Sequence, residues 1–280
     1  MITATIESVF KQTYPDFELI IVDDGSSDNT EQTIKERYSN NEKLRYFYKQ
    51  NEERGAARNF GLKQAKGDFA IFFDSDDLMH DNHLEVLNSY ITKLEAVNII
   101  ATKHNWLRSG NIKPSTIQKI KEGWYGKELF IEGNGLACNF CVRVNNPSLI
   151  LFREDRKLVT MEDWIFLLEN TCSDKIFIID KTTLTLVDHN ERSLTMNFQI
   201  TSAKRLYATS WIAENIHLDT RELTKLKASS YVFCSVFSYL AKKNLQSLSF
   251  LFKAIRIDGL DKKKVMLFFK NIMLVNWWRH

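Results

Sequence analysis

The sequence predicts an α/β fold, with a mainly parallel sheet flanked by helices and a helical appendage at the C-terminus. Apolar runs of strand length end in polar turns, and they alternate with segments whose apolar residues recur at helical spacing. The run 69–73 is apolar throughout, which is typical of a parallel strand covered by helices on both faces. Beyond about residue 200 the alternation stops and the chain becomes helical and more basic. We therefore expect an α/β domain over residues 1–200 and a helical, basic region over residues 201–280.

The elements of the first hundred residues are expected in regular order. The helical spacing of Ile2, Ile6, Val9 and Phe10 predicts a first helix, which Tyr14-Pro15 ends. Apolar runs predict strands at 17–22, 44–48 and 69–73. Helices are expected between and after them at 30–38, 55–65 and 83–94, with Asp28 or Asn29 as N-cap of the first.

The middle of the chain is less regular. Residues 103–144 show no sustained periodicity, and long irregular segments of this kind are often binding loops. A helix at 162–170 and a buried strand at 176–179 follow.

Three carboxylates crowd into the segment Asp74–Asp77, directly behind the strand at 69–73. Two unit charges about 4 Å apart repel by about 4 kcal/mol at an effective dielectric constant near 20. Such a cluster either spreads into water as a solvated turn or gathers a cation. The pair Asp23-Asp24 also follows a strand, and the carboxyl ends of parallel strands lie at one edge of a sheet. Both acidic groups are therefore expected at one cleft.

Other segments offer polar side chains whose chemistry is less specific. Arg54 and Arg58 open a helix and can donate paired hydrogen bonds to a carboxylate or a phosphate, or serve as ordinary surface arginines. The pair Glu162-Asp163 begins a helix, where acidic residues often only complement the helix dipole. His189 reads as a surface loop histidine, with metal ligation as the alternative.

Taken together, these segments resemble the family 2 glycosyltransferases, enzymes with a GT-A, Rossmann-like nucleotide-sugar-binding fold. The resemblance rests on five segments in the family's order: Gln12–Tyr14, Ile21–Asp28, Arg54–Gly61, Phe73–Asp77 and Glu162-Asp163. They span roughly residues 1 to 195. Each segment is weak alone, but the ordered set is specific.

The resemblance implies how the nucleotide-sugar donor is bound. Asp23 and Asp24 would receive the nucleotide base, usually uracil. Arg58, together with Arg54, would line the nucleotide pocket. Asp74 would bind the ribose within the family's D-x-D motif.

The resemblance also implies a metal and a base. Asp74 and Asp76 of the D-x-D motif, with Asp77, would hold Mn²⁺ or Mg²⁺ on the donor diphosphate, and His189 would meet the same metal. Asp163 would be the catalytic base, with Glu162 beside it among the donor-binding residues. One base and one metal suffice for a single displacement with inversion.

The implied function is transfer of a sugar from a nucleotide-diphosphate donor, with a UDP-sugar favoured, to a hydroxyl of a glycan or lipid-linked acceptor. Bacterial surface-polysaccharide synthesis is the expected pathway. The chain starts inside the helix that follows the family's first strand, so that strand is expected to be missing. The alternative is therefore a non-catalytic, truncated GT-A remnant that binds nucleotide or serves as a partner subunit. A nucleotidyltransferase would show a glycine-rich phosphate loop near the start, and none is found.

Composition narrows the class of partner and the location. A net charge of +3 and the lack of an aromatic-basic RNA motif argue against nucleic-acid binding. No apolar stretch reaches the roughly 18 residues of a membrane span, and the N-terminus lacks signal-peptide features. A cytoplasmic location is expected. Residues 250–280 mix apolar and basic residues, which predicts either an appendage packed on the domain or peripheral contact with the inner face of a membrane.

Overall fold

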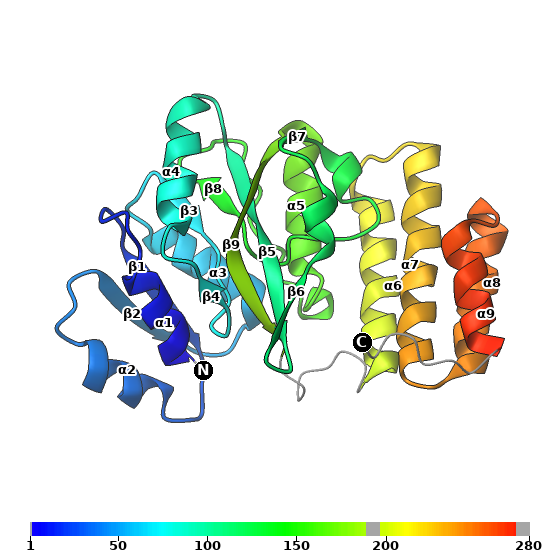
Figure 1. Cartoon of the computed structure of the whole chain (residues 1–280), viewed down its shortest axis with the longest axis horizontal. Coiled ribbons are helices and arrows are strands. Elements are labelled where there is room, and N and C mark those ends of the chain that lie inside the picture. The colour runs from blue at the N-terminus through cyan, green and yellow to red at the C-terminus, as the bar shows by residue number, and fades with distance from the viewer. Residues whose placement is uncertain (1, 189–196, 273–280) are drawn as a thin grey trace. The chain divides into compact units, whose positions relative to one another are not determined.

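The computed structural model describes residues 2–188 and 197–272 (Figure 1). Contacts between residues divide the chain into two compact units, each described here by itself. The first unit comprises residues 1–127 and 134–188, and the second comprises residues 128–133 and 189–280. The segment 128–133 thus belongs with the C-terminal helices. The boundary expected at residue 200 stays a prediction.

A small parallel sheet begins the first unit. Strand β1 (Leu19–Asp24) pairs in parallel with β2 (Leu44–Lys49), so that Asp24 lies opposite Lys49. The helices of this region are α1 (Ile2–Phe10), α2 (Thr30–Tyr38) and α3 (Glu53–Gln64). The apolar faces of α1 and α2 pack with β1 around Ile6, Ile21 and Ile34, because residues three and four apart share a helix face.

The second sheet of this unit has seven strands and is mixed. Its central order is β3 (Phe69–Ile71), β8 (Cys141–Arg143), β5 (Ile99–Arg108), β9 (Ile176–Asp188) and β4 (Leu78–Met79). Strand β6 (Asn111–Pro114) pairs with β5, and β7 (Gly123–Tyr125) pairs with β9. Helices α4 (His83–Lys93) and α5 (Glu162–Ser173) belong to the same unit.

The α/β class is confirmed, but two details of the prediction are wrong. Only β1 with β2 and β5 with β9 pair in parallel, whereas the five other pairings in the described residues are antiparallel. The segment 103–144 is not irregular, because it contains part of β5 and all of β6, β7 and β8. The sequence did not predict β6, β7 and β8, because each is only three or four residues long and too short to show a periodic pattern. The same short strands supply most of the antiparallel pairings.

Strands β1 and β3 lie in different sheets in the described residues, since β1 pairs with β2 and β3 pairs with β8.

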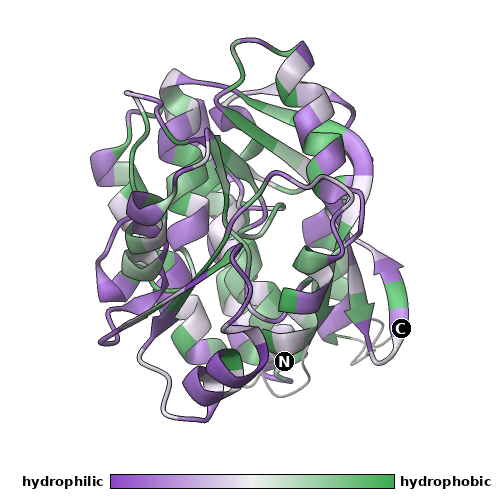
Figure 2. Ribbon diagram, turned by 90° about the vertical axis from the view of Figure 1, so that its left-hand side faces the viewer, coloured by the Kyte–Doolittle hydropathy of each residue, from purple (hydrophilic) through white to green (hydrophobic). Residues whose placement is uncertain are grey.

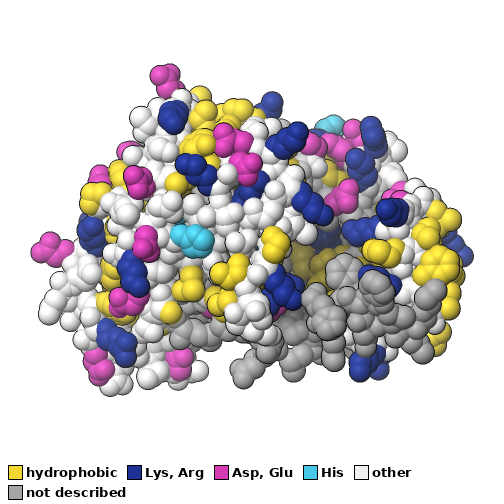
Figure 3. Space-filling view, in the orientation of Figure 1, with side chains coloured by type: hydrophobic (Ala, Val, Ile, Leu, Met, Phe, Trp, Pro, Cys, Tyr) yellow, Lys and Arg dark blue, Asp and Glu magenta, His cyan; other side chains and the backbone are white. Residues whose placement is uncertain are grey.

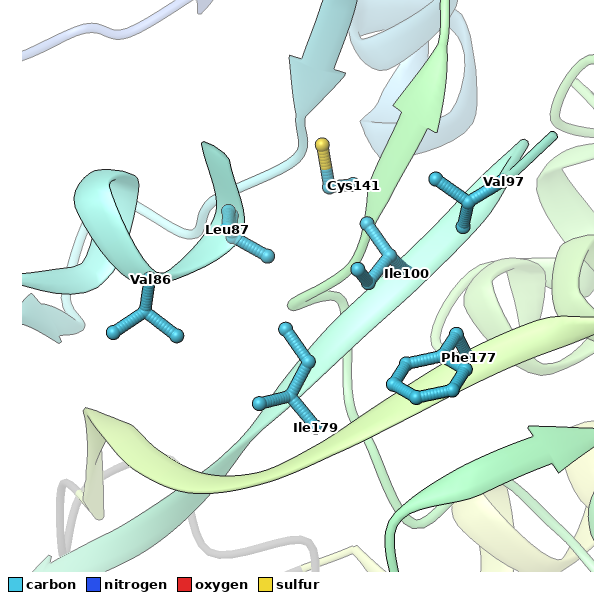
Figure 4. Packing of buried hydrophobic residues seen from close by; sticks show 7 residues of the cluster. All are labelled: Val86, Leu87, Val97, Ile100, Cys141, Phe177 and Ile179. Atoms are coloured by element: carbon cyan, nitrogen blue, oxygen red, sulfur yellow. The ribbon is translucent and has the colours of Figure 1, made fainter. Parts of the chain in front are cut away.

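A cluster of buried apolar side chains packs against the larger sheet (Figure 4). Val86 and Leu87 on α4 point toward Ile100 on β5 and Ile179 on β9, and all four side chains are buried. Phe177 and Cys141 extend the same cluster along the sheet. Figure 2 shows hydrophobic residues along several strands, while the helices carry both hydrophobic and hydrophilic residues. Burial of this kind is the main favourable term in folding.

Within residues 197–272, the second unit contains four helices: α6 (Phe198–Asn215), α7 (Thr220–Leu240), α8 (Asn244–Asp258) and α9 (Lys262–Ile272). A capping box between Asp219 and Glu222 starts α7. Helices α7 and α8 approach closely where Ser235 and Ser247 each donate a hydrogen bond to the other's carbonyl oxygen, at 2.8 Å. Among the described residues, no helix has the length and apolar character needed to cross a membrane.

The core cluster supports a stability prediction. Ile100→Ala removes a side chain with no exposed surface from the sheet core and leaves a cavity. We expect the free energy of unfolding to fall by about 2–5 kcal/mol, measured by urea denaturation. The control is Ile112→Ala on β6, whose side chain is 64% exposed and whose loss should cost less than about 0.5 kcal/mol. Equal losses in the two variants would contradict the assignment of this core.

Candidate functional site

The acidic turn after β3 brings three carboxylates together. Oxygen atoms of Asp74, Asp76 and Asp77 all lie within 4.8 Å of one another. Helix α1 positions the turn through Thr5. The Thr5 hydroxyl donates hydrogen bonds to the carbonyl oxygens of Ser75 at 3.0 Å and Asp77 at 2.9 Å. The crowding expected from the sequence is therefore present, and the turn's backbone is fixed by a residue seventy positions away.

Asp77 is the buried member of this cluster, with 4% of its surface exposed. Its Oδ1 accepts a hydrogen bond from the Val187 backbone N–H at 3.0 Å, near the end of β9. Burial, together with the charges of Asp74 and Asp76, raises the pKa of Asp77 to about 7, while the hydrogen bond from Val187 opposes the shift. A divalent cation would favour the ionised form of all three carboxylates. Hard oxygen ligands of this kind suit Mg²⁺ and Mn²⁺, so the residues fit the metal implied by the resemblance.

Arg58 connects the acidic turn to α5. Its Nη2 donates to Asp74 Oδ1 at 2.9 Å, and its Nη1 donates to Glu162 Oε1 at 2.7 Å. The guanidinium also lies over the ring of Phe152, with 5.4 Å from Cζ to the ring centroid. Three segments distant in the sequence, α3, the turn after β3 and the start of α5, therefore meet at one cation.

Asp163 lies next to this ion-pair network. Its Oδ2 accepts a hydrogen bond from Asn134 Nδ2 at 2.7 Å, and its Oδ1 accepts one from the Trp164 N–H at 2.8 Å. Burial raises the pKa of Asp163 to about 6, and the neighbouring Glu162 charge raises it too, while Arg58 and Asn134 oppose this shift. A carboxylate that titrates near neutral pH is suited to taking up a proton.

The second acidic group lies at the end of β1. Asp23 is buried, and its carboxylate accepts hydrogen bonds from the Tyr46 hydroxyl at 2.6 Å and the Ser26 N–H at 2.7 Å. Asp24 Oδ1 is 2.8 Å from Lys49 Nζ and also accepts from the Glu52 N–H. Asp23 and Asp24 are thus held by β2 and by the loop that enters α3.

Two glycines allow the backbone to approach closely around these residues. Gly25 has a φ of 81°, and a Cβ there would lie 2.9 Å from the Asn51 backbone nitrogen. A Cβ on Gly55 would lie 2.7 Å from the Arg153 carbonyl oxygen. Any larger residue at either position would push the β1 loop or α3 out of place.

The structure brings Arg58, Asp74, Asp76, Asp77, Glu162 and Asp163 into one region. Arg54 lies exposed in the first turn of α3. His189 falls outside the described residues. Sequence reasoning missed four residues that contact the site: Asn134, Thr5, Tyr46 and Lys49. Only Lys49 had a usable signal, since in-register pairing of two parallel strands places it opposite Asp24. Asn134 sits in a segment without periodicity, so nothing in the sequence connects it to Asp163.

Removal of the bridging cation should destabilise the fold. Arg58→Met leaves Glu162, which is 3% exposed, without its ion-pair partner, and its Oε2 has no hydrogen-bond partner among the described residues. We expect a loss of about 3–5 kcal/mol in the free energy of unfolding. The control Arg37→Met, exposed on α2, should change it by less than about 0.5 kcal/mol. Adding Glu162→Gln to Arg58→Met should recover part of the loss, and no recovery would argue against a buried charge as the cause.

The hydrogen bond from Asn134 should lower the pKa of Asp163. Asn134→Ala removes a hydrogen bond to the ionised carboxylate, so we expect the pKa of Asp163 to rise by about one pH unit. Carboxyl-carbon NMR titration measures this shift, and Asp163→Asn identifies the resonance. Asn215→Ala, exposed at the end of α6, is the control and should leave the titration unchanged. A titration unaltered by Asn134→Ala would remove Asn134 from this role.

Comparison with known proteins identifies the family of this chain. The Glycosyl transferase family 2 model matches residues 1–147, more than half of the 280 residues. An uncharacterized glycosyltransferase of Rickettsia felis is 37% identical over 126 residues, which cover 40% of this chain and 21% of that protein. The chain thus spans about a fifth of the length of the first curated relatives it matches. TarP of Staphylococcus aureus, a poly(ribitol-phosphate) beta-N-acetylglucosaminyltransferase, is 29% identical over 73% of this chain and 64% of its own.

Solved structures agree on the fold. TarS of S. aureus superposes with a TM-score of 0.63 at 22% identity, over 95% of this chain and 48% of the TarS chain. A shorter TarS chain in complex with UDP-GlcNAc gives a TM-score of 0.60 at 19% identity, over 99% of this chain and 89% of that one. The likeness confirms the GT-A fold. The chain belongs to glycosyl transferase family 2.

Proposed function

We propose that this chain is a metal-dependent, inverting glycosyltransferase that moves a sugar from a nucleotide-diphosphate donor to a hydroxyl group. The observation that carries the proposal is the Arg58 bridge, which joins the carboxylates of the acidic turn to the helix start that bears Asp163. Family membership supports the reaction class. The complex of TarS with UDP-GlcNAc supports a UDP-sugar as the donor.

In this proposal the acidic residues bind the nucleotide base, hold the metal ion or act as the base. Asp23 and Asp24 receive the nucleotide base, and Arg54 lines the same pocket. Asp74, Asp76 and Asp77 hold Mn²⁺ or Mg²⁺, with His189 as a further ligand from outside the described residues. An ion held there would supply positive charge to the diphosphate of the leaving nucleotide.

Asp163 acts as the base that accepts the proton of the acceptor hydroxyl. A hydroxyl is a weak nucleophile until a positioned carboxylate takes its proton in the transition state. Asn134 and the Trp164 N–H hold the two oxygens of Asp163, which limits its rotation. The neighbouring Glu162 charge raises the pKa of Asp163, and the Arg58 charge lowers it. Only the ionised carboxylate accepts a proton, so transfer should decline as the pH falls through about 6.

A glycan or lipid-linked acceptor fits the relatives best. TarP acts on poly(ribitol-phosphate), and chondroitin synthase of Escherichia coli is 31% identical over 40% of this chain. The first name describes sugar transfer to a polymer and the second describes polymer synthesis, which supports a place in bacterial surface-polysaccharide assembly.

A second candidate is a non-catalytic nucleotide-binding or partner subunit. The division of the sheet between β1 and β3 favours it, because the Asp23–Asp24 group and the acidic turn belong to different sheets. A donor site built across two sheets is held less firmly than one built on a continuous sheet.

Thermal unfolding with nucleotides tests the proposal and separates it from this alternative. We expect UDP or UDP-GlcNAc to raise the melting temperature by a few degrees only when Mn²⁺ is present, since a ligand at a hundred times its Kd adds about 2.7 kcal/mol. GDP, TDP and CMP serve as competing nucleotides. Asp76→Asn should abolish the Mn²⁺-dependent rise, whereas Asp16→Asn, an exposed acid, should preserve it.

Asp163→Asn should retain this rise while sugar transfer or donor hydrolysis, followed by UDP release, falls at least a hundredfold. Loss of nucleotide binding in Asp163→Asn would remove it from the role of base. A cooperative transition that no nucleotide shifts in the unmodified chain would favour the non-catalytic subunit.

A further inference from the structure

Large apolar side chains are exposed on the last two helices. Of the thirteen such side chains exposed in the described residues, seven lie between 245 and 272, so this surface is concentrated on α8, α9 and the turn between them. They are Leu245, Phe252, Leu260, Val265, Met266, Phe269 and Ile272. Hydrophobic side chains are visible at the right-hand edge of Figure 3, where Figure 1 shows α8 and α9. Grouped apolar exposure of this kind marks interaction sites.

Helix α9 has two opposite faces. Lys264, Leu267 and Asn271 are buried, and Leu267 packs with Tyr239 and Leu251 in the core of the second unit. Val265, Phe269 and Ile272 recur at four- and three-residue spacing on the other face and are exposed. The outer stripe is therefore not a misplaced core face, because α9 already buries a separate one.

The exposed stripe continues onto α8 through aromatic contacts. The rings of Phe252 and Phe268 meet edge to face with centroids 6.2 Å apart, and those of Phe268 and Phe269 do so at 5.9 Å. Phe252 of α8 and Phe269 of α9 thus bound one continuous aromatic ridge, which both helices hold rigidly.

The same segment is strongly basic. Residues 241–272 contain eight Lys or Arg and two Asp or Glu, giving a net charge of +6, while the whole chain carries +3. The two acids, Asp258 and Asp261, both bind the buried Lys264, at 2.6 and 2.7 Å. Six of the other basic side chains are exposed: Lys242, Lys243, Lys253, Arg256, Lys262 and Lys263. The seventh, Lys270, is half-buried.

We propose that α8 and α9 form a docking surface for an anionic lipid bilayer. The apolar stripe would enter the boundary between headgroups and acyl chains, and the surrounding cations would bind the acidic headgroups. Charge selects this occupant over a second copy of the chain, because two faces of net charge +6 repel when they meet. The inference goes beyond the proposed transferase activity, and its test needs no substrate.

Vesicle co-sedimentation of the full chain tests the proposal. We expect binding to vesicles of phosphatidylcholine with phosphatidylglycerol, little binding to phosphatidylcholine alone, and weakening with added NaCl. Phe269→Asp should weaken binding at least about tenfold, since it places a charge in the apolar stripe. Ile112→Asp, at an exposed position on β6, is the matched control and should bind normally.

A pair of double variants isolates the electrostatic part. Lys262→Glu with Lys263→Glu should weaken binding about tenfold or more. Lys225→Glu with Lys227→Glu on α7 changes the net charge equally at exposed positions outside the surface and should have a much smaller effect. Circular dichroism and thermal unfolding confirm that each variant is folded.

Three outcomes would overturn the proposal. Equal binding to neutral and anionic vesicles would exclude recognition of acidic lipid. Equal effects of the two double variants would show that net charge alone drives adsorption. Self-association that Phe269→Asp abolishes, without vesicle binding, would identify a second copy of the chain as the occupant of this surface.

Discussion

The pair of ion pairs made by Arg58 is the constraint on which the candidate site depends. One guanidinium on α3 binds Asp74 in the turn after β3 and Glu162 at the start of α5. Glu162 is buried, and a buried carboxylate without a partner carries a large desolvation cost. Because a single cation faces both carboxylates, the acidic turn and Asp163 cannot shift independently of one another.

The acidic turn is positioned mainly by neutral groups. The Thr5 hydroxyl donates to its carbonyl oxygens, and the Val187 N–H donates to Asp77. These two donors are neutral, so they fix the turn without adding positive charge to it. Burial and the charges of Asp74 and Asp76 raise the pKa of Asp77, because they disfavour its ionised form.

In the second unit a buried basic residue pairs with two acidic residues. Lys264 is buried and binds Asp258, Asp261 and the Gly259 carbonyl oxygen, which anchors the start of α9 to the end of α8. That anchor neutralises the acids of the segment and leaves the remaining basic side chains on the surface. One buried lysine thus joins the two helices and pairs with both acidic residues of the segment.

The sequence by itself determined the α/β class, the presence of α1, the bounds of α2 and α4 within a residue, and the two acidic groups that follow β1 and β3. These features depend on local periodicity and on residue type, which neighbours along the chain reveal. Tertiary structure alone decided the mixed pairing of the larger sheet, the short strands β6, β7 and β8, and the contacts of Arg58 and Asn134. A three-residue strand has no period to read, and a hydrogen bond between residues 29 or 104 positions apart exists only once packing has brought its donor and acceptor together.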